Sequence, residues 1–151
     1  MDNFVISSQV LTVDNRKNHI HILITRFNLK IETDKGWLRA SEEWMEHRWE
    51  LFINYCVPSV LAQTTKSFIW IIYFDHKTSQ HFRRKIDILC KQNSNIIPVY
   101  VETFKAFTRH LPVYILDEYA RHYDYVITTR LIMTIFYIQK LWRLFKILLF
   151  R

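Results

Sequence analysis

The stretch SFIWIIYFD, Ser67–Asp75, determines the fold class that we expect for this chain of 151 residues. Its apolar part, Phe68–Phe74, is continuous and far too short to span a bilayer. A short apolar run of this kind is typical of a strand that is buried on both faces of a parallel sheet. Asp75 ends the run, at the point where a loop on the ligand-binding edge of such a sheet begins.

Strand and helix patterns alternate on both sides of this stretch. We predict strands at His19–Phe27, Ser67–Asp75, Ile96–Val101 and Tyr125–Leu131, and helices at Ser41–Cys56, Thr78–Asn93 and Leu111–Tyr123. Ser41 is the expected N-cap of the first helix, Pro58 is expected to interrupt that helix, and Pro112 falls in the first turn of the last one. The alternation predicts an α/β fold, a Rossmann-like and mostly parallel sheet with helices on both faces.

Composition and charge exclude several classes of protein. Half of the residues are hydrophobic and 23% are charged, as in a globular domain. One glycine in the whole chain excludes glycine-rich phosphate loops. The net charge is +7, but Ile132–Arg151 carries four basic residues and no acid, which leaves 17 basic against 14 acidic residues elsewhere. This balance gives only weak support to a basic nucleic-acid interface, so nucleic acid is not an expected partner.

The cysteines and the N-terminus bear on the cellular compartment. Cys56 and Cys90 lie in predicted helices and form no CxxC pair or disulfide framework, which favours free thiols in a reducing environment. The first ten residues lack the basic and long apolar regions of a signal peptide. We therefore expect a cytoplasmic protein. His19 and His21 share a strand face without an acid or thiol placed beside them, so no metal site is predicted there.

Polar residues end three of the predicted strands, at the edge where parallel sheets bind ligands. They are Thr25 and Arg26, then Asp75, then Thr129 and Arg130. Each arginine either binds phosphate bidentately or extends into solvent, and two of them at one edge favour phosphate. Asp75 either accepts hydrogen bonds from a nucleotide or serves as a turn or cap residue, and the sequence leaves both interpretations open.

Three segments carry a resemblance to a known family. They are HILITRF (His21–Phe27), the long run WLRASEEWMEHRWELFINYCVPSVLAQTTKSFIWIIYFDHKT (Trp37–Thr78) and YVITTRL (Tyr125–Leu131). Over most of residues 19–131 the chain resembles the putative rhamnosyl transferases, a family of bacterial glycosyltransferases with a GT-A-like fold. The resemblance implies transfer of a sugar, with rhamnose as the candidate, from a nucleotide-sugar donor to a glycan acceptor in cell-surface polysaccharide synthesis.

The resemblance also implies roles for particular residues. Thr25, Arg26, Asp75, Thr129 and Arg130 are the implied donor-binding residues, and no catalytic residue is assigned. In the family the segment ITTRL leads into an acidic motif of the type DNDD, which holds Mg²⁺ or Mn²⁺ on the donor diphosphate. Here the sequence after Leu131 reads IMTIF, so the metal motif is absent. Acceptor-side residues would lie beyond residue 131, and we expect this chain to be an inactive fragment.

A shift of reading frame is one explanation of the missing acids, and a natural, divergent C-terminus is the alternative. Every Ile codon begins with AT, Met is ATG and every Thr codon begins with AC. One G placed before the codons of Ile132–Ile135 therefore gives Asp as the first and third new residues, whichever codons the gene uses. We hypothesise that one base was lost near the Leu131 codon. The domain assignment is then a nucleotide-sugar-binding part at residues 1–131 and an out-of-frame tail at residues 132–151.

A second hypothesis comes from the tail itself. As a helix, residues 132–151 place Lys140, Arg143 and Lys146 on a polar face opposite Trp142 and Phe145. This pattern is typical of a helix that lies on a membrane surface. The predicted fold thus includes an aberrant C-terminal helix after an incomplete sheet. The alternative function is a membrane-surface-binding protein, in peripheral contact with the inner membrane face.

Overall fold

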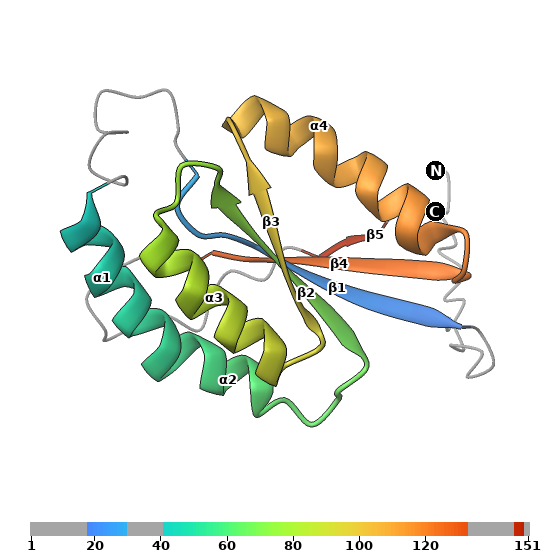
Figure 1. The fold of residues 1–151 in the computed structure, drawn as a ribbon. Helices are drawn as coiled ribbons and strands as arrows, with labels where there is room; N and C mark the ends of the chain where they lie inside the picture. The colour runs from blue at the N-terminus through green and yellow to red at the C-terminus, as the bar shows by residue number, and fades with distance from the viewer. Residues whose placement is uncertain (1–17, 30–40, 133–146, 150–151) are drawn as a thin grey trace, which may run out of the picture.

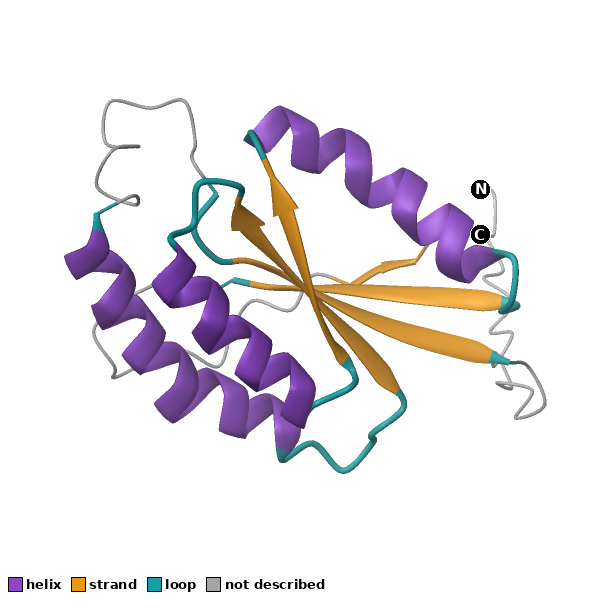
Figure 2. Cartoon of the chain, viewed as in Figure 1, coloured by secondary structure: helices purple, strands orange, loops and turns teal. Residues whose placement is uncertain are grey.

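The computed structural model describes residues 18–29, 41–132 and 147–149, and its centre is one twisted sheet between two layers of helices (Figures 1 and 2). The strands are β1 (His19–Arg26), β2 (Phe68–Asp75), β3 (Ile96–Val101), β4 (Tyr125–Leu131) and β5 (Ile147–Leu149). The helices are α1 (Glu42–Leu51), α2 (Val57–Leu61), α3 (Gln80–Gln92) and α4 (Phe104–Ile115). Π-helical turns at Phe52–Cys56 and Leu116–Ala120 follow α1 and α4.

The strand order is β3-β2-β1-β4-β5, and the first four strands are parallel. The prediction that the three long apolar runs are neighbours is confirmed, since β1 lies between β2 and β4. The predicted α/β class and mostly parallel sheet are confirmed as well. All the parallel strands deliver their carboxyl ends to one edge, which is the edge that binds ligands in such folds.

Two apolar clusters, one on each face of the sheet, explain why β2 reads as a continuous apolar run. Trp70, Ile72 and Phe74 face the layer formed by α1, α2 and α3. Ile71 and Tyr73 alternate with them and face α4 on the other side. All five side chains are at most 1% exposed. Burial of both faces therefore removes the polar alternation that a half-exposed strand would show.

The first helix is longer than the sequence suggested. Ser41 is the N-cap as predicted, and its hydroxyl accepts a hydrogen bond from the Trp44 N–H at 3.2 Å. Pro58 does not interrupt the helix, because α1, the π-helical turn and α2 continue to Leu61. In that turn the Val57 N–H donates to the carbonyl of Phe52, so the hydrogen-bond pattern has already shifted where the proline lacks its N–H.

The last helix begins earlier than predicted. Helix α4 starts at Phe104 and not near Leu111, and the Thr103 hydroxyl caps it by accepting from the Ala106 N–H at 3.0 Å. Pro112 is therefore inside the helix and not in its first turn. The π-helical turn that follows ends at Ala120, short of the predicted Tyr123. A capping threonine at the start and a shift of hydrogen bonding after the proline account for both differences.

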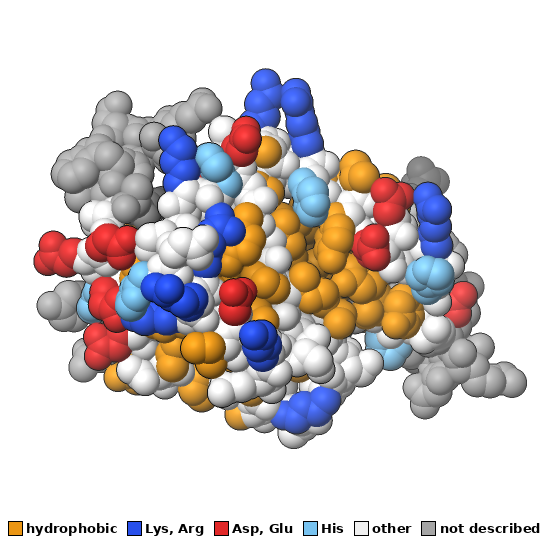
Figure 3. Space-filling view, viewed as in Figure 1, with side chains coloured by type: hydrophobic (Ala, Val, Ile, Leu, Met, Phe, Trp, Pro, Cys, Tyr) orange, Lys and Arg blue, Asp and Glu red, His pale blue; other side chains and the backbone are white. Residues whose placement is uncertain are grey.

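Strand β3 lies at one border of the described sheet, and Pro98 protects it. The Trp70 N–H donates to the Asn95 carbonyl and the His76 N–H to the Val101 carbonyl, so alternate β3 residues turn their backbone toward β2. Pro98 falls on the alternate set whose backbone faces outward, where its missing N–H costs no ladder bond and offers no donor to another strand. Figure 3 shows hydrophobic side chains gathered between α3 and α4, where this half-buried strand lies.

The tail differs from the predicted helix where the structure describes it. Ile147–Leu149 is a strand, β5, which pairs antiparallel with β4. The helix prediction is wrong at these three residues, because the open edge of β4 offers unpaired backbone donors and acceptors that a strand can satisfy. Residues 133–146 and 150–151 lie outside the described residues, so most of the amphipathic pattern stays a prediction. Among the described residues, no helix is long and apolar enough to cross a membrane.

Candidate functional site

The ends of β1, β2 and β4 define the candidate site. Strand β1 ends at Arg26, β2 ends at Asp75, and Arg130 is the next-to-last residue of β4. The register pairs Arg26 with Tyr73 and Arg130 with Ile24. Arg26 therefore lies two residues further than Arg130 in the direction of the strands. The structure therefore brings the three charged residues to the same edge of the sheet. Their role in donor binding stays a prediction.

Strand alternation places these three residues on the same face of the sheet, the face that α4 covers. Asp75 follows Tyr73 by two residues, and Arg130 is level with Ile24; Tyr73 and Ile24 belong to the apolar cluster beneath α4. Arg26 points the same way, because its guanidinium carbon lies 4.9 Å from the ring centroid of Phe104. The aromatic ring supports the cation without neutralising it. Arg130 is exposed.

Thr25 and Thr129, also expected to bind the donor, lie on the opposite face. Thr25 is fully buried and accepts a hydrogen bond from the Trp70 indole N–H at 2.9 Å. Thr129 is 5% exposed, and a hydrogen bond of 2.8 Å joins its hydroxyl to Nε2 of His21. Both hydroxyl groups are therefore hydrogen-bonded within the protein, on the face of the sheet that carries Leu23 and Trp70. We therefore remove these two residues from the proposed donor contacts.

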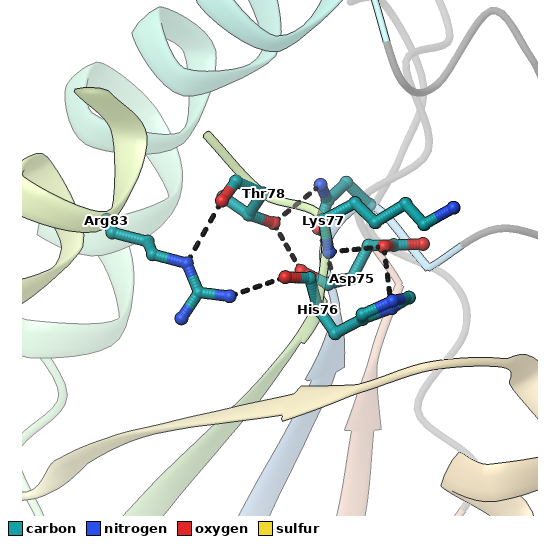
Figure 4. A network of polar contacts seen from close by, with 6 residues as sticks. Asp75, His76, Lys77, Thr78 and Arg83 are labelled. Carbon is teal, nitrogen blue, oxygen red and sulfur yellow. Dashed lines mark hydrogen bonds and ion pairs between the residues drawn. The ribbon is translucent and has the colours of Figure 1, made fainter. Parts of the chain in front are cut away.

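Asp75 begins a tight turn that fixes its carboxylate (Figure 4). The Thr78 N–H donates to the Asp75 carbonyl at 3.0 Å, which closes the turn. The Lys77 N–H donates to Oδ1 of Asp75 at 2.8 Å, and Nδ1 of His76 lies 3.4 Å from the same oxygen. Among the described residues, Oδ2 has no such partner. Asp75 is thus a turn residue, as one interpretation held, and it also has an oxygen available for a ligand.

Asn28 ties this turn to the end of β1. Its side-chain oxygen accepts from the Asp75 N–H at 3.0 Å, and its amide nitrogen donates to the Thr78 hydroxyl at 3.1 Å. Asn28 is 5% exposed, so both hydrogen bonds are shielded from water. Sequence reasoning missed this residue. A polar amide directly after an apolar strand was the available signal, but its partners lie about 50 residues away along the chain.

Arg83 holds the turn from the other side and was also missed (Figure 4). It lies in the second turn of α3, and its side chain donates to the carbonyls of Thr78 and His76 at 3.0 and 2.5 Å. Its guanidinium carbon lies 4.0 Å from the ring centroid of Tyr100 on β3. Two neighbouring elements, α3 and β3, therefore hold the cation against the loop that carries Asp75.

The residues present do not fit the divalent metal that the resemblance implies. The described residues contain no group of three or more His, Cys, Asp or Glu side chains that could hold a metal ion. In the sequence, Ile132–Arg151 contains no Asp or Glu, so no carboxylate pair follows β4. Mg²⁺ and Mn²⁺ require oxygen ligands, which carboxylates supply best. We therefore derive no step of chemistry through a metal in this chain.

Together, these features define a Rossmann-like α/β protein in which parallel strands bring Arg26, Asp75 and Arg130 to one edge of the sheet. The family model described as "Putative rhamnosyl transferase" matches residues 21–131. The chain belongs to this family, whose description names a transferase. Comparison with curated proteins and with solved structures gave no match.

Proposed function

We propose that residues 21–131 form the donor-binding part of a glycosyltransferase that uses a nucleoside diphosphate sugar, with rhamnose as the candidate sugar. The acceptor is a glycan of the cell surface, and the reaction takes place in the cytoplasm. One observation carries the proposal: Arg26, Asp75 and Arg130 come from three neighbouring strands and share one face of the ligand-binding edge. The family match supplies the reaction class.

The chemistry of the donor explains why these residue types suit the site. Glycosyl transfer breaks the bond between the anomeric carbon and the diphosphate, which departs with additional negative charge. Arg26 and Arg130 supply fixed positive charge and planar pairs of donors for phosphate oxygens. Oδ2 of Asp75 accepts a hydrogen bond from the nucleoside. In this arrangement the sheet edge recognises the part of the donor that stays constant whichever acceptor is used.

The proposal assigns donor binding to this chain and does not assign turnover to it. The family's acidic motif would follow Leu131, and no acid is present there. We propose that a single lost base removed it, because restoring one G creates Asp at the first and third positions after Leu131. Sequencing the gene through and past the stop codon tests this directly. An open frame that continues in the shifted phase is the expected result, and immediate stop codons in that phase would contradict it.

Calorimetry tests donor binding. The unaltered chain is titrated with uridine and thymidine 5′-diphosphate, each with and without Mn²⁺, and we expect weak binding that Mn²⁺ does not strengthen. Arg26→Ala should weaken binding about 10- to 100-fold, since a hydrogen bond to a charged group contributes about 1.5–3 kcal/mol. Arg109→Ala is the matched control, because Arg109 is an exposed arginine on α4. Equal affinities for the two variants would refute the assignment of Arg26.

The frame-restored protein provides the second arm of this test. It should bind the diphosphate sugar in a metal-dependent way, because two close carboxylates can hold the cation on the diphosphate. Tight metal-dependent binding by the 151-residue chain itself would overturn the inactive-fragment hypothesis. No binding by the restored protein would count against the glycosyltransferase assignment.

A further inference from the structure

Arg83 is the fourth residue of α3, just beyond the first turn of the helix. The N-terminal end of a helix carries partial positive charge, which does not favour positive side chains in the first turn. The first turn of α3 contains no acidic residue that would offset it. Among the described residues, the hydrogen bonds of Arg83 go to two carbonyl oxygens of the loop and none goes to a carboxylate. The side chain is therefore directed at the loop backbone.

One of these two carbonyls belongs to a peptide group that also contacts Asp75. The carbonyl of His76 and the N–H of Lys77 are the two ends of one planar, trans peptide group, so they point in opposite directions. Arg83 donates to the carbonyl end, and the Lys77 N–H donates to Oδ1 of Asp75 at 2.8 Å. The guanidinium thus holds the plane whose other end orients the carboxylate (Figure 4).

The charge of Arg83 also strengthens the hydrogen bond to the carboxylate. A cation at the carbonyl oxygen draws electron density through the peptide group and makes its N–H a better donor. The ring of Tyr100, 4.0 Å from the guanidinium carbon, limits where the cation can move. Asn28 fixes the Asp75 N–H from the opposite side of the loop. The carboxylate is consequently held by a loop that is fixed at both ends before any ligand arrives.

We propose that Arg83 is a positioning residue for donor binding: it orients Asp75 through the His76–Lys77 peptide group without touching the donor. This inference rests on the proposed function. A preorganised carboxylate binds its ligand more tightly, because the loop loses less conformational freedom on binding. Removing the Arg83 side chain should therefore weaken nucleotide binding in a chain that is still folded.

The test compares Arg83→Ala with Arg84→Ala, its exposed neighbour on α3, which serves as the matched control for loss of one positive charge. The probe is uridine or thymidine 5′-diphosphate, whichever the unaltered chain binds more tightly, in metal-free buffer. Binding is measured by calorimetry, and hydrogen exchange of the Lys77 amide is followed by NMR. We expect Arg83→Ala to weaken binding about tenfold and to speed Lys77 exchange about tenfold relative to Arg84→Ala. Arg83→Lys should give an intermediate affinity and an intermediate exchange rate, since an ammonium group keeps the charge but lacks the planar pair of donors of the guanidinium.

Asp75→Asn separates failure of this inference from failure of the proposed function. If the unaltered chain binds neither nucleotide, or if Asp75→Asn binds as tightly as the unaltered chain, the proposed role of Asp75 is refuted, and the role of Arg83 with it. If Asp75→Asn weakens binding while Arg83→Ala behaves like Arg84→Ala, only the positioning role is refuted. Weaker binding by Arg83→Ala with unchanged Lys77 exchange would mean that Arg83 touches the donor, which also contradicts the inference.

Discussion

Replacing Thr25 with valine distinguishes a core residue from a ligand contact. Valine has nearly the shape of threonine and lacks the hydroxyl, so Thr25→Val leaves the Trp70 indole N–H without its acceptor at 2.9 Å. Both side chains are fully buried, and water cannot replace the lost bond. A buried donor without a partner costs about 1–3 kcal/mol of stability. For a chain of this size, a loss of about 2 kcal/mol lowers the melting temperature by roughly 4–8 °C.

The assay is urea denaturation followed by circular dichroism, with three comparison variants. Thr25→Ser keeps the hydroxyl and loses one methyl group, which should cost about 1 kcal/mol. Thr108→Val removes a hydroxyl from the exposed surface of α4 and should change stability by less than about 0.5 kcal/mol. In the double variant Thr25→Val with Trp70→Phe, the losses should be less than additive by about 1 kcal/mol, because the second change removes the unpaired donor.

Nucleotide binding by the same variant completes the test. The structure places Thr25 on the face opposite Arg26 and Asp75, so Thr25→Val should bind a nucleoside diphosphate with unchanged affinity at a temperature where it is folded. Stability equal to that of the unaltered chain would refute the hydrogen-bond argument. Lost affinity without lost stability would restore Thr25 as a donor contact and refute the assignment of faces.

Two further predictions concern titratable groups. Burial raises the pKa of Cys56 to about 12 and that of Cys90 to about 11. At pH 8, Cys56 of the folded chain should therefore react with iodoacetamide about a thousandfold more slowly than Cys56 of the unfolded chain, and Cys90 should react before Cys56. Rapid labelling of folded Cys56 would contradict its burial. Burial, reinforced by the charge of His19, lowers the pKa of His21, so the unfolded chain binds its proton at a higher pH than the folded chain does. The contribution of His21 to the free energy of unfolding should therefore be complete above about pH 7 and should fall as the pH drops through about 6.5. His21→Asn should make stability less dependent on pH in this range, while the same change at exposed His47 should not.

The layered fold could be predicted because its signals are local. The continuous run in β2 already showed that both faces of the strand are buried, and helix-length segments between apolar runs imply parallel pairing. Helix ends were harder to predict. Pro112 suggested that the last helix starts near Leu111, whereas α4 is capped by Thr103 and starts at Phe104. The π-helical turns after α1 and α4 have no simple sequence pattern.

The site was predicted to the level of the sheet edge and no further. Adjacent residues at the end of a strand point to opposite faces, so Thr25 and Arg26 cannot both face the same ligand. The sequence gives the strand end but not which face stays open. Asn28 and Arg83 were missed for another reason: Asn28 lies about 50 residues from its loop partners, and the Arg83 contacts depend on how α3 leaves the loop.

The packing of the α1–α3 layer explains why the charges gather on the other face. Its aromatic core extends to the very end of β1, where the ring of Phe27 lies 5.2 Å from those of Phe52 and Phe74. That face of the edge is packed with aromatic side chains, Thr25 is hydrogen-bonded within this core, and the guanidinium carbon of buried Arg48 lies 5.2 Å from the Phe27 ring centroid. On the other face α4 begins only at Phe104, with Arg26 lying over its first ring. Among the described residues, Arg26, Asp75 and Arg130 lie on the α4 side, so we expect a ligand that binds at this edge to approach from that side.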